Sequence, residues 1–159
     1  MVTLPKTIKM VITDFDGIIT DNCVYIDSQG EMSRKLNFKD IMAFSLLKKN
    51  GYLIAIISGE ANSAIEVIAK KFNIEEIHQG IRDKLEVLND IVKRYGLKDD
   101  EYLYIGDDVN DLDSLIQTKY AITVPNAVKK VRCVQGIQLT QNRGGDGAFR
   151  EVADALIES

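Results

Sequence analysis

The sequence predicts an α/β fold in which helices cover both faces of a parallel sheet. Short apolar runs such as IKMVIT, YLIAII and YLYI alternate with segments whose apolar residues recur every three or four positions. Each run ends at a polar loop (DFDG, SGE or GDD), as buried parallel strands commonly do. The chain of 159 residues, 45% of them hydrophobic, is long enough for one core. We therefore expect a single three-layer domain over residues 1–159.

The first strand is followed by a hairpin before the first helix begins. The strand is expected over residues 8–13, an apolar run that stops at Asp14. Residues 23–38 have two β-rich arms around the sequence SQG, which predicts a hairpin outside the main sheet. Helical spacing starts at Asp40, the expected N-cap, and Gly51 can end this helix in the left-handed conformation.

The middle of the chain repeats the unit of strand and helix. A strand is expected over residues 52–57, and the next helix, over residues 61–72, has apolar residues at i, i+3, i+4 and i+7. A short strand over residues 76–78 precedes a helix over residues 84–95 with the same spacing. The run YLYI then predicts a strand over residues 102–105.

The last third of the chain continues the alternation with shorter elements. A helix over residues 109–117 and a strand over residues 120–124 are followed by a short helix, a short strand near Ile137 and a last helix after Gly147. Residues 141–147, QNRGGDG, form a glycine-rich loop, and we expect this loop to be the most mobile part.

Composition excludes several classes of protein. The net charge of −4, the pI near 5.1 and the scattered Lys and Arg residues argue against nucleic-acid binding. No apolar run approaches the length of a membrane span, and the N-terminus looks like a first strand, so we expect a cytoplasmic protein without a membrane partner. Cys23 and Cys133 lack the spacing of a metal knuckle or redox pair and are expected to be reduced thiols.

Five aspartates stand in two tight groups, and both groups follow predicted strands. Because ligands bind beyond the carboxyl ends of parallel strands, these loops should meet the SGE loop and the loop before Lys84 at one edge of the sheet. The two groups would repel each other unless a cation lay between them. The five residues are Asp14, Asp16, Asp107, Asp108 and Asp111.

The residue types in these loops suit phosphoryl transfer. Asp14, at the end of its strand, can act as a nucleophile that forms an aspartyl-phosphate, and Asp16 can protonate the leaving oxygen and then activate water. Mg²⁺ fits Asp14 and Asp107 together with a carbonyl from Asp16. Lys84, paired with Asp108 or Asp111, would be a second cation. The hydroxyl of Ser58 and the amide of Gly59 complete the hydrogen bonds to the phosphoryl group.

Each of these motifs also has an ordinary structural interpretation. An acidic turn after a strand is common, Asp107 or Asp108 could simply cap a helix, and Lys84 could be a solvated lysine. Their occurrence together in successive loops favours a phosphate site. A phospho-receiver domain would need its acceptor aspartate near mid-chain, where none fits. His78 is the only histidine and is expected to be structural.

The motifs ITDFDGIITD, IISG, QGIRDK and YIGDDVND resemble those of the haloacid dehalogenase superfamily of phosphatases. More narrowly, the chain is similar to a capless branch that acts on 3-deoxy-2-ulosonic acid phosphates such as 3-deoxy-D-manno-octulosonate 8-phosphate. The resemblance implies a Rossmann-like three-layer sheet with no cap domain and a Mg²⁺-dependent phosphomonoesterase. It also implies a homotetramer assembled by the hairpin at 23–38, with the tail RGGDGAFRE helping to close the site.

The resemblance also implies roles for individual residues. Asp14 matches the nucleophile, Asp16 the acid/base and second metal contact, and Asp107 the third metal ligand. Phosphate binding falls to Ser58, Gly59 and Lys84, while Asp108 and Asp111 match acidic residues that orient the metal water and the lysine. The positions where this branch recognises its substrate are occupied by Thr20, Asn37, Lys39, Asp40 and Arg143.

One position departs from the octulosonate enzymes. They commonly carry an arginine where this chain has Glu60, and Glu60 with Lys71 resembles relatives that act on nine-carbon acids, the 9-phosphates of deaminated neuraminate (KDN) or N-acetylneuraminate. A carboxylate would accept hydrogen bonds from sugar hydroxyls or an ammonium. Glu60 could equally be an exposed acid at a helix start. A further alternative is a non-catalytic oligomerisation module, like the domains fused to sugar-acid cytidylyltransferases.

Overall fold

The computed structural model describes residues 2–158 and contains a six-stranded, fully parallel sheet. Its strand order is β5-β4-β1-β6-β7-β8, so β1 lies near the centre and pairs with β4 and β6. The expected α/β fold is confirmed, and no cap domain is present between residues 2 and 158. The strands are β1 (Met10–Thr13), β4 (Leu53–Ile57), β5 (Glu76–His78), β6 (Tyr102–Ile105), β7 (Ala121–Thr123) and β8 (Gln138–Leu139).

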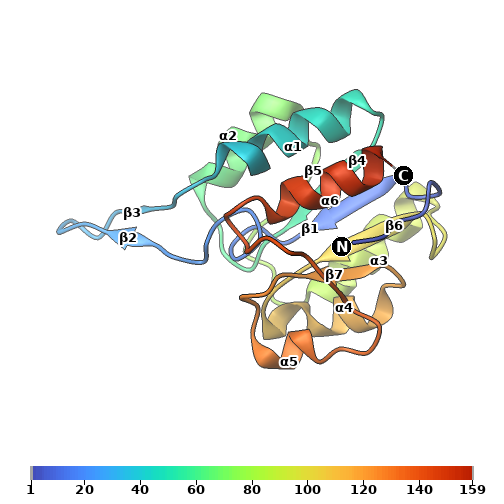
Figure 1. The fold of residues 1–159 in the computed structure, drawn as a ribbon. Coiled ribbons are helices and arrows are strands. Elements are labelled where there is room, and N and C mark those ends of the chain that lie inside the picture. The colour runs from blue at the N-terminus through green and yellow to red at the C-terminus, as the bar shows by residue number, and fades with distance from the viewer. Residues whose placement is uncertain (1, 159) are drawn as a thin grey trace.

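Helices cover both faces of this sheet (Figure 1). On one face lie α1 (Phe38–Lys49), α2 (Ser63–Phe72) and α6 (Ala148–Ile157), with α1 packed between the other two. On the other face lie α3 (Lys84–Tyr95), α4 (Leu112–Gln117) and α5 (Lys129–Arg132), and a 3₁₀ turn (Val109–Asp111) leads into α4. Among the helices described, none has the length and apolar character needed to cross a bilayer.

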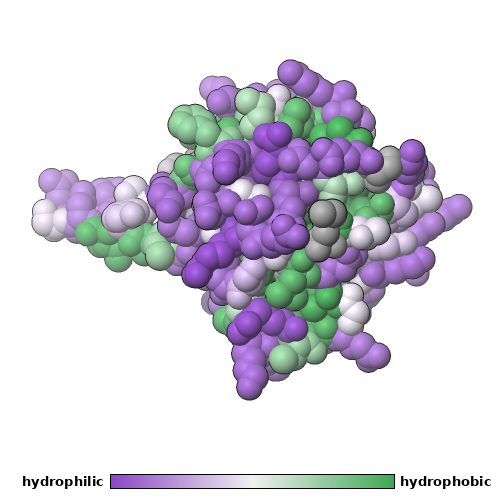
Figure 2. Space-filling model, viewed as in Figure 1, coloured by the Kyte–Doolittle hydropathy of each residue, from purple (hydrophilic) through white to green (hydrophobic). Residues whose placement is uncertain are grey.

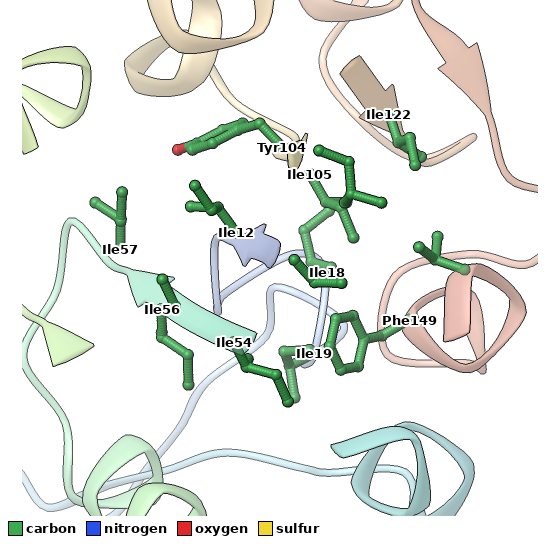
Figure 3. Close-up of a cluster of buried hydrophobic side chains, with 14 of the residues drawn as sticks. Ile12, Ile18, Ile19, Ile54, Ile56, Ile57, Tyr104, Ile105, Ile122 and Phe149 are labelled. Atoms are coloured by element: carbon green, nitrogen blue, oxygen red, sulfur yellow. The ribbon is translucent and has the colours of Figure 1, made fainter. Parts of the chain in front are cut away.

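The core forms on both sides of the central strand (Figure 3). Ile12 of β1 lies beside Tyr104 of β6 on one face of the sheet. Ile54 and Ile56 of β4 project to the opposite face, where Phe149 of α6 also lies, and all of these residues are buried. Burial on both faces explains why the strands read as continuous apolar runs without polar alternation.

The predicted hairpin is present and projects away from the sheet (Figure 1). Only β2 (Tyr25–Ile26) and β3 (Met32–Ser33) pair within it, so its regular part is shorter than the predicted span. Several of its apolar side chains are exposed and form an apolar surface on the projection (Figure 2): Val24, Tyr25, Ile26 and Met32.

The prediction that Asp40 caps the first helix is wrong. The cap is Asn37, whose side chain accepts a hydrogen bond from the Lys39 amide (2.9 Å), and α1 begins at Phe38. Asp40 lies one turn further on, fully buried, and its carboxylate accepts hydrogen bonds from the amides of Gly147 (2.9 Å) and Arg150 (3.1 Å). It therefore fastens the start of α6 to α1, an arrangement that local spacing does not reveal.

The glycine-rich loop at 141–147, expected to be the most mobile part, contacts the loop after β1 through Gly144 and Gly145. The Gly145 amide donates to the Ile18 carbonyl (2.9 Å), and the Gly144 amide donates to Asn126 Oδ1 (2.9 Å). A side chain at Gly144 would overlap the carbonyl oxygen of Gly17. The glycines thus allow close contact with the loop that follows β1, and this contact fixes both segments.

Candidate active site

Four loops at the carboxyl ends of the strands enclose a pocket of about 400 Å³. These are the loops that follow β1, β4, β5 and β6, as the topology of a parallel sheet predicts. Seven of the residues singled out from the sequence line the pocket: Asp14, Asp16, Ser58, Gly59, Glu60, Asp107 and Asp108. Four residues that were not singled out also line it: Asn22, Ile81, Arg82 and Asn110.

Lys84 connects carboxylates from two of these loops. Its Nζ lies 3.0 Å from Asp14 Oδ2 and 2.7 Å from Asp111 Oδ1, and all three residues are buried. Burial alone would lower the pKa of Lys84, but the two carboxylates outweigh it and the pKa is raised. The pKa of Asp14 is raised well above its ordinary value by burial and by Asp111. Lys84 is therefore a fixed cation at the base of the pocket.

Asp111 organises the loop after β6. Its Oδ1 accepts hydrogen bonds from Lys84 and from the Tyr104 hydroxyl (2.7 Å), and its Oδ2 accepts from the amides of Asp107 (3.1 Å) and Asp108 (3.2 Å). Of the two predicted partners for Lys84, the structure selects Asp111. The Asp108 side chain instead caps the 3₁₀ turn by accepting from the Val109 amide (2.6 Å).

Asp14 and Asp107 supply the oxygen atoms that suit a metal ion. Carboxylate oxygens of Asp14, Asp107 and Asp111 lie within 4.8 Å of one another, but those of Asp111 are already occupied by its four donors. Burial, followed by repulsion from Asp111, raises the pKa of Asp107 to about 7. Crowded, buried carboxylates of this kind fit a hard divalent cation, and Mg²⁺ is the cofactor that matches this donor set.

Gly17 allows the loop after β1 to reach Asp107. Its φ is +89°, in the region that favours glycine, and a Cβ atom at this position would overlap the Asp107 carboxylate. Asn22 approaches from the same loop and donates from Nδ2 to Asp107 Oδ2 (3.3 Å). The two acidic loops are thus held together by direct contact.

Asp16 is held by two side chains on one of its oxygens. Its Oδ1 accepts from Arg34 Nε (2.8 Å) and from the Thr20 hydroxyl (3.1 Å). Thr20, expected at the substrate, is completely buried and contacts Asp16. Arg34 was not singled out, because it lies on the returning arm of the hairpin and no local spacing links it to Asp16.

Ser58 and Gly59 form the pocket wall beside β4. Ser58 is buried, and its hydroxyl donates to the Glu60 carbonyl (2.8 Å). A Cβ atom on Gly59 would lie 2.9 Å from Asn110 Nδ2, so the Asn110 side chain approaches this glycine closely. The Glu60 side chain lines the open part of the pocket.

Several expected substrate contacts lie away from this pocket. Lys71 is in the last turn of α2, which carries it away from the carboxyl ends of the strands. Asn37 donates to Asp146 Oδ1 (3.5 Å), and Arg143 is exposed without lining the pocket. Lys39 lines a separate groove of about 910 Å³ beside α6. Asp40 is enclosed between α1 and α6 and does not line this pocket, so its contact with substrate stays a prediction.

His78 is also outside the pocket. Its Nε2 lies 3.0 Å from Glu76 Oε2, and Glu76 forms a two-point ion pair with Arg94 (2.8 Å for each contact). These contacts join β5 to α3. The structural interpretation of His78 agrees with this position.

Comparison with known proteins identifies the family. A model of the haloacid dehalogenase-like hydrolases matches residues 11–150, a range that contains all four loops of the pocket. The chain belongs to this family. The predicted phosphatase class is confirmed for this hydrolase. A similar protein is the 3-deoxy-D-manno-octulosonate 8-phosphate phosphatase KdsC of Yersinia pestis, 29% identical over 150 residues that cover 94% of this chain and 80% of the relative.

Solved structures show the same fold. One is the 3-deoxy-D-manno-octulosonate 8-phosphate phosphatase of Moraxella catarrhalis, in complex with magnesium ion, phosphate ion and 3-deoxy-D-manno-octulosonate (KDO). This hydrolase superposes on it with a TM-score of 0.90 and 33% identity, over 96% of this chain and 87% of that one. A cobalt-bound phosphatase from Haemophilus influenzae has a TM-score of 0.88 and 27% identity, over 96% of this chain and 89% of the other.

Proposed function

We propose that this hydrolase is a Mg²⁺-dependent phosphomonoesterase that acts on a 3-deoxy-2-ulosonic acid phosphate, with KDO 8-phosphate as the first candidate. The observation that carries the proposal is the buried arrangement of Asp14, Lys84 and Asp111 beside Asp107 in one pocket. The similarity to a phosphatase bound to magnesium, phosphate and KDO supports the substrate class. Such a reaction would place the enzyme in lipopolysaccharide biosynthesis.

In the proposed reaction, a carboxylate oxygen of Asp14 attacks the phosphorus atom. A bond from Asp14 to phosphorus forms, and the bond from phosphorus to the sugar oxygen breaks. Lys84 and the Gly59 amide would stabilise the phosphoryl oxygens, and the Ser58 hydroxyl would join them by turning from the Glu60 carbonyl to the phosphoryl group. Mg²⁺, held by Asp14, Asp107 and the Asp16 carbonyl, would neutralise charge between the nucleophile and the phosphate.

Asp16 would move the protons. Arg34 and Thr20 both bind its Oδ1, which leaves Oδ2 at the pocket as the atom that can hold a proton. Asp16 would give this proton to the departing sugar oxygen. It would then take a proton from water, whose oxygen attacks phosphorus and releases Asp14 and inorganic phosphate. The second half-reaction thus returns Asp14 and Asp16 to the states in which the first began.

Glu60 favours a second candidate substrate, the 9-phosphate of KDN or N-acetylneuraminate. Its side chain lines the pocket, where a carboxylate can accept hydrogen bonds from sugar hydroxyls. The alternative of a non-catalytic module is less consistent with the site, because every residue expected for turnover is present and the buried Lys84 is paired with Asp14 and Asp111.

We also propose that the hairpin assembles a homotetramer. Tyr25, Ile26 and Met32 are each more than half exposed on the projection, and burying them against other copies would remove apolar surface from water. Light scattering tests this proposal. Ile26→Asp should lower the particle mass and Asp27→Asn should not, whereas an unchanged mass with Ile26→Asp would contradict it.

The function is tested by phosphate release from KDO 8-phosphate and the two nonulosonate 9-phosphates, with Mg²⁺ and with a chelator. Asp14→Asn should lower kcat by at least about 10³-fold and preserve the fold by circular dichroism. Asp113→Asn, a matched change at an exposed aspartate of α4, should retain activity. Release from none of the three substrates would contradict the proposed substrate class, and normal turnover by Asp14→Asn would contradict the nucleophile.

A further inference from the structure

The pocket has many carboxylates and few cations. Five acidic side chains line it, and its only basic lining residue among those described is Arg82. The Lys84 ammonium is already shared between Asp14 and Asp111. A sugar acid phosphate brings a carboxylate in addition to its phosphate group, so its second negative charge would meet repulsion unless another cation received it.

Arg82 stands on a short loop that is fixed on both sides. Before it, the Ile81 amide donates to the Ser58 carbonyl (3.0 Å). After it, Asp83 caps α3 by accepting from the Glu86 amide (3.0 Å), and the next residue is the buried Lys84. The backbone direction at Arg82 is therefore set by anchored neighbours, which leaves only the long side chain to adjust.

The Arg82 guanidinium is unpaired among the residues that the structure describes. Its side chain is exposed at the pocket, and within residues 2–158 it makes no hydrogen bond or ion pair. Arg34, the other arginine near the acidic loops, differs because its Nε is bound to Asp16. Arg34 does not line the pocket, so among the described residues Arg82 is the one placed to offer two parallel donors to a planar carboxylate there.

Arg82 lies at the exposed part of the pocket, away from the buried Lys84. The bond from Ile81 to Ser58 places it beside the Ser58-Gly59-Glu60 segment, and Asn110 approaches Gly59 from the loop after β6. Lys84, Asp14 and Asp107 lie deeper, and the phosphate belongs with them. Arg82, Glu60 and Asn110 thus surround the open part of the pocket, where the rest of the substrate must project.

We propose that Arg82 binds the carboxylate of the sugar acid and so selects anionic over neutral sugar phosphates. Glu60 and Asn110 would receive hydroxyl groups beside it. This inference rests on the proposed function, because it assumes a substrate that carries a carboxylate. It assigns a specificity residue that neither the motifs nor the spacing of the acidic loops indicated.

The experiment measures the preference for acid over neutral substrates as a ratio of kcat/KM values. Two matched pairs are used: KDO 8-phosphate with its C1-alcohol analogue, and 6-phosphogluconate with glucose 6-phosphate. Arg82→Met removes the charge at similar size, and Arg82→Lys keeps the charge without the two-donor fork. Lys93→Met, in the last turn of α3, is the control for the loss of one surface charge.

We expect Arg82→Met to lower the acid-to-neutral ratio about 10- to 100-fold, the value of one charged hydrogen-bonded contact. Arg82→Lys should give an intermediate ratio, and Lys93→Met should keep that of the wild type. An equal ratio in the wild type and Arg82→Met, or no preference for the acid in the wild type, overturns the assignment. Absence of hydrolysis in both pairs instead overturns the proposed function, and the inference with it.

Discussion

Replacement of Lys84 by methionine tests the electrostatic organisation of the site. The Lys84 Nζ lies 3.0 Å and 2.7 Å from two carboxylates that have almost no contact with solvent. At an effective dielectric constant of 20, each contact corresponds to about 6 kcal/mol of attraction, most of which offsets the cost of removing the charges from water. Leaving the carboxylates without the ammonium should lower the free energy of unfolding by about 3 to 5 kcal/mol.

The loss should depend on pH in a defined direction. Burial and Asp111 already raise the pKa of Asp14, and removal of Lys84 takes away the charge that opposes this rise. The folded variant therefore binds a proton more readily than its unfolded chain does, so its stability increases as pH falls. The difference from the wild type should be largest near pH 8 and smaller near pH 5.5.

Urea unfolding in the presence of a chelator, followed by circular dichroism, measures both effects. Lys93→Met is the matched control and should change the free energy of unfolding by less than about 0.5 kcal/mol. Combining Lys84→Met with Asp111→Asn should recover part of the loss, because one of the two buried charges is then absent. A loss below about 1 kcal/mol at pH 8, or an equal loss at pH 5.5, would refute the reasoning.

Three further predictions concern the acidic loops and the edge of the sheet. Gly17→Ala should lower kcat/KM by at least about 10²-fold and weaken activation by Mg²⁺, because the new Cβ atom would displace the Asp107 carboxylate. A Mg²⁺ activation curve equal to that of the wild type would contradict the close contact between Gly17 and Asp107. Mg²⁺ binding should tighten as pH rises through about 7, because Asp107 must release its proton to bind the ion. Calorimetry in two buffers of different ionisation enthalpy should detect this released proton, and its absence would contradict Asp107 as a metal ligand. Arg94 and then His78 lower the pKa of Glu76 to about 2, so its stabilisation is complete above about pH 5 and disappears as pH falls through 2. Glu76→Gln should therefore cost about 1 to 2 kcal/mol at pH 7, allowing for screening around the half-exposed Arg94, and an equal cost near pH 2 would disprove the ion-pair explanation.

Much of the site could be predicted because its residues are tied to strand ends. Asp14 and Asp107 follow β1 and β6, which are neighbours in the sheet, so parallel pairing alone brings their loops together. The predicted pairing of Lys84 was also open to reasoning from topology, although the choice between Asp108 and Asp111 was not. That choice depends on the 3₁₀ turn, which directs Asp108 to its own helix start and Asp111 inward.

Other assignments required contacts between distant segments. Asp40 occupies the first turn of α1, where an acidic side chain ordinarily interacts with the N-terminus of its own helix. It instead accepts hydrogen bonds from amides more than 100 residues away in sequence. The composition of the loop at 144 and 145 suggested mobility, but these glycines lie against the backbone of the loop after β1, where a side chain would not fit. Lys71 belongs to the helix that follows the SGE loop, but the direction of α2 carries Lys71 away from the pocket.

The order of strands and helices, the acidic strand ends and the family motifs could be read from the sequence, because periodicity and strand termini are local properties of the chain. The pairing of the charges, the bond from Arg34 to Asp16 and the approach of Arg82 to the pocket became visible only in the three-dimensional arrangement. These contacts join loops that are far apart in sequence. The physical reason is that a side chain's partner is set by where loops cross in space, and no spacing within a single segment encodes that crossing.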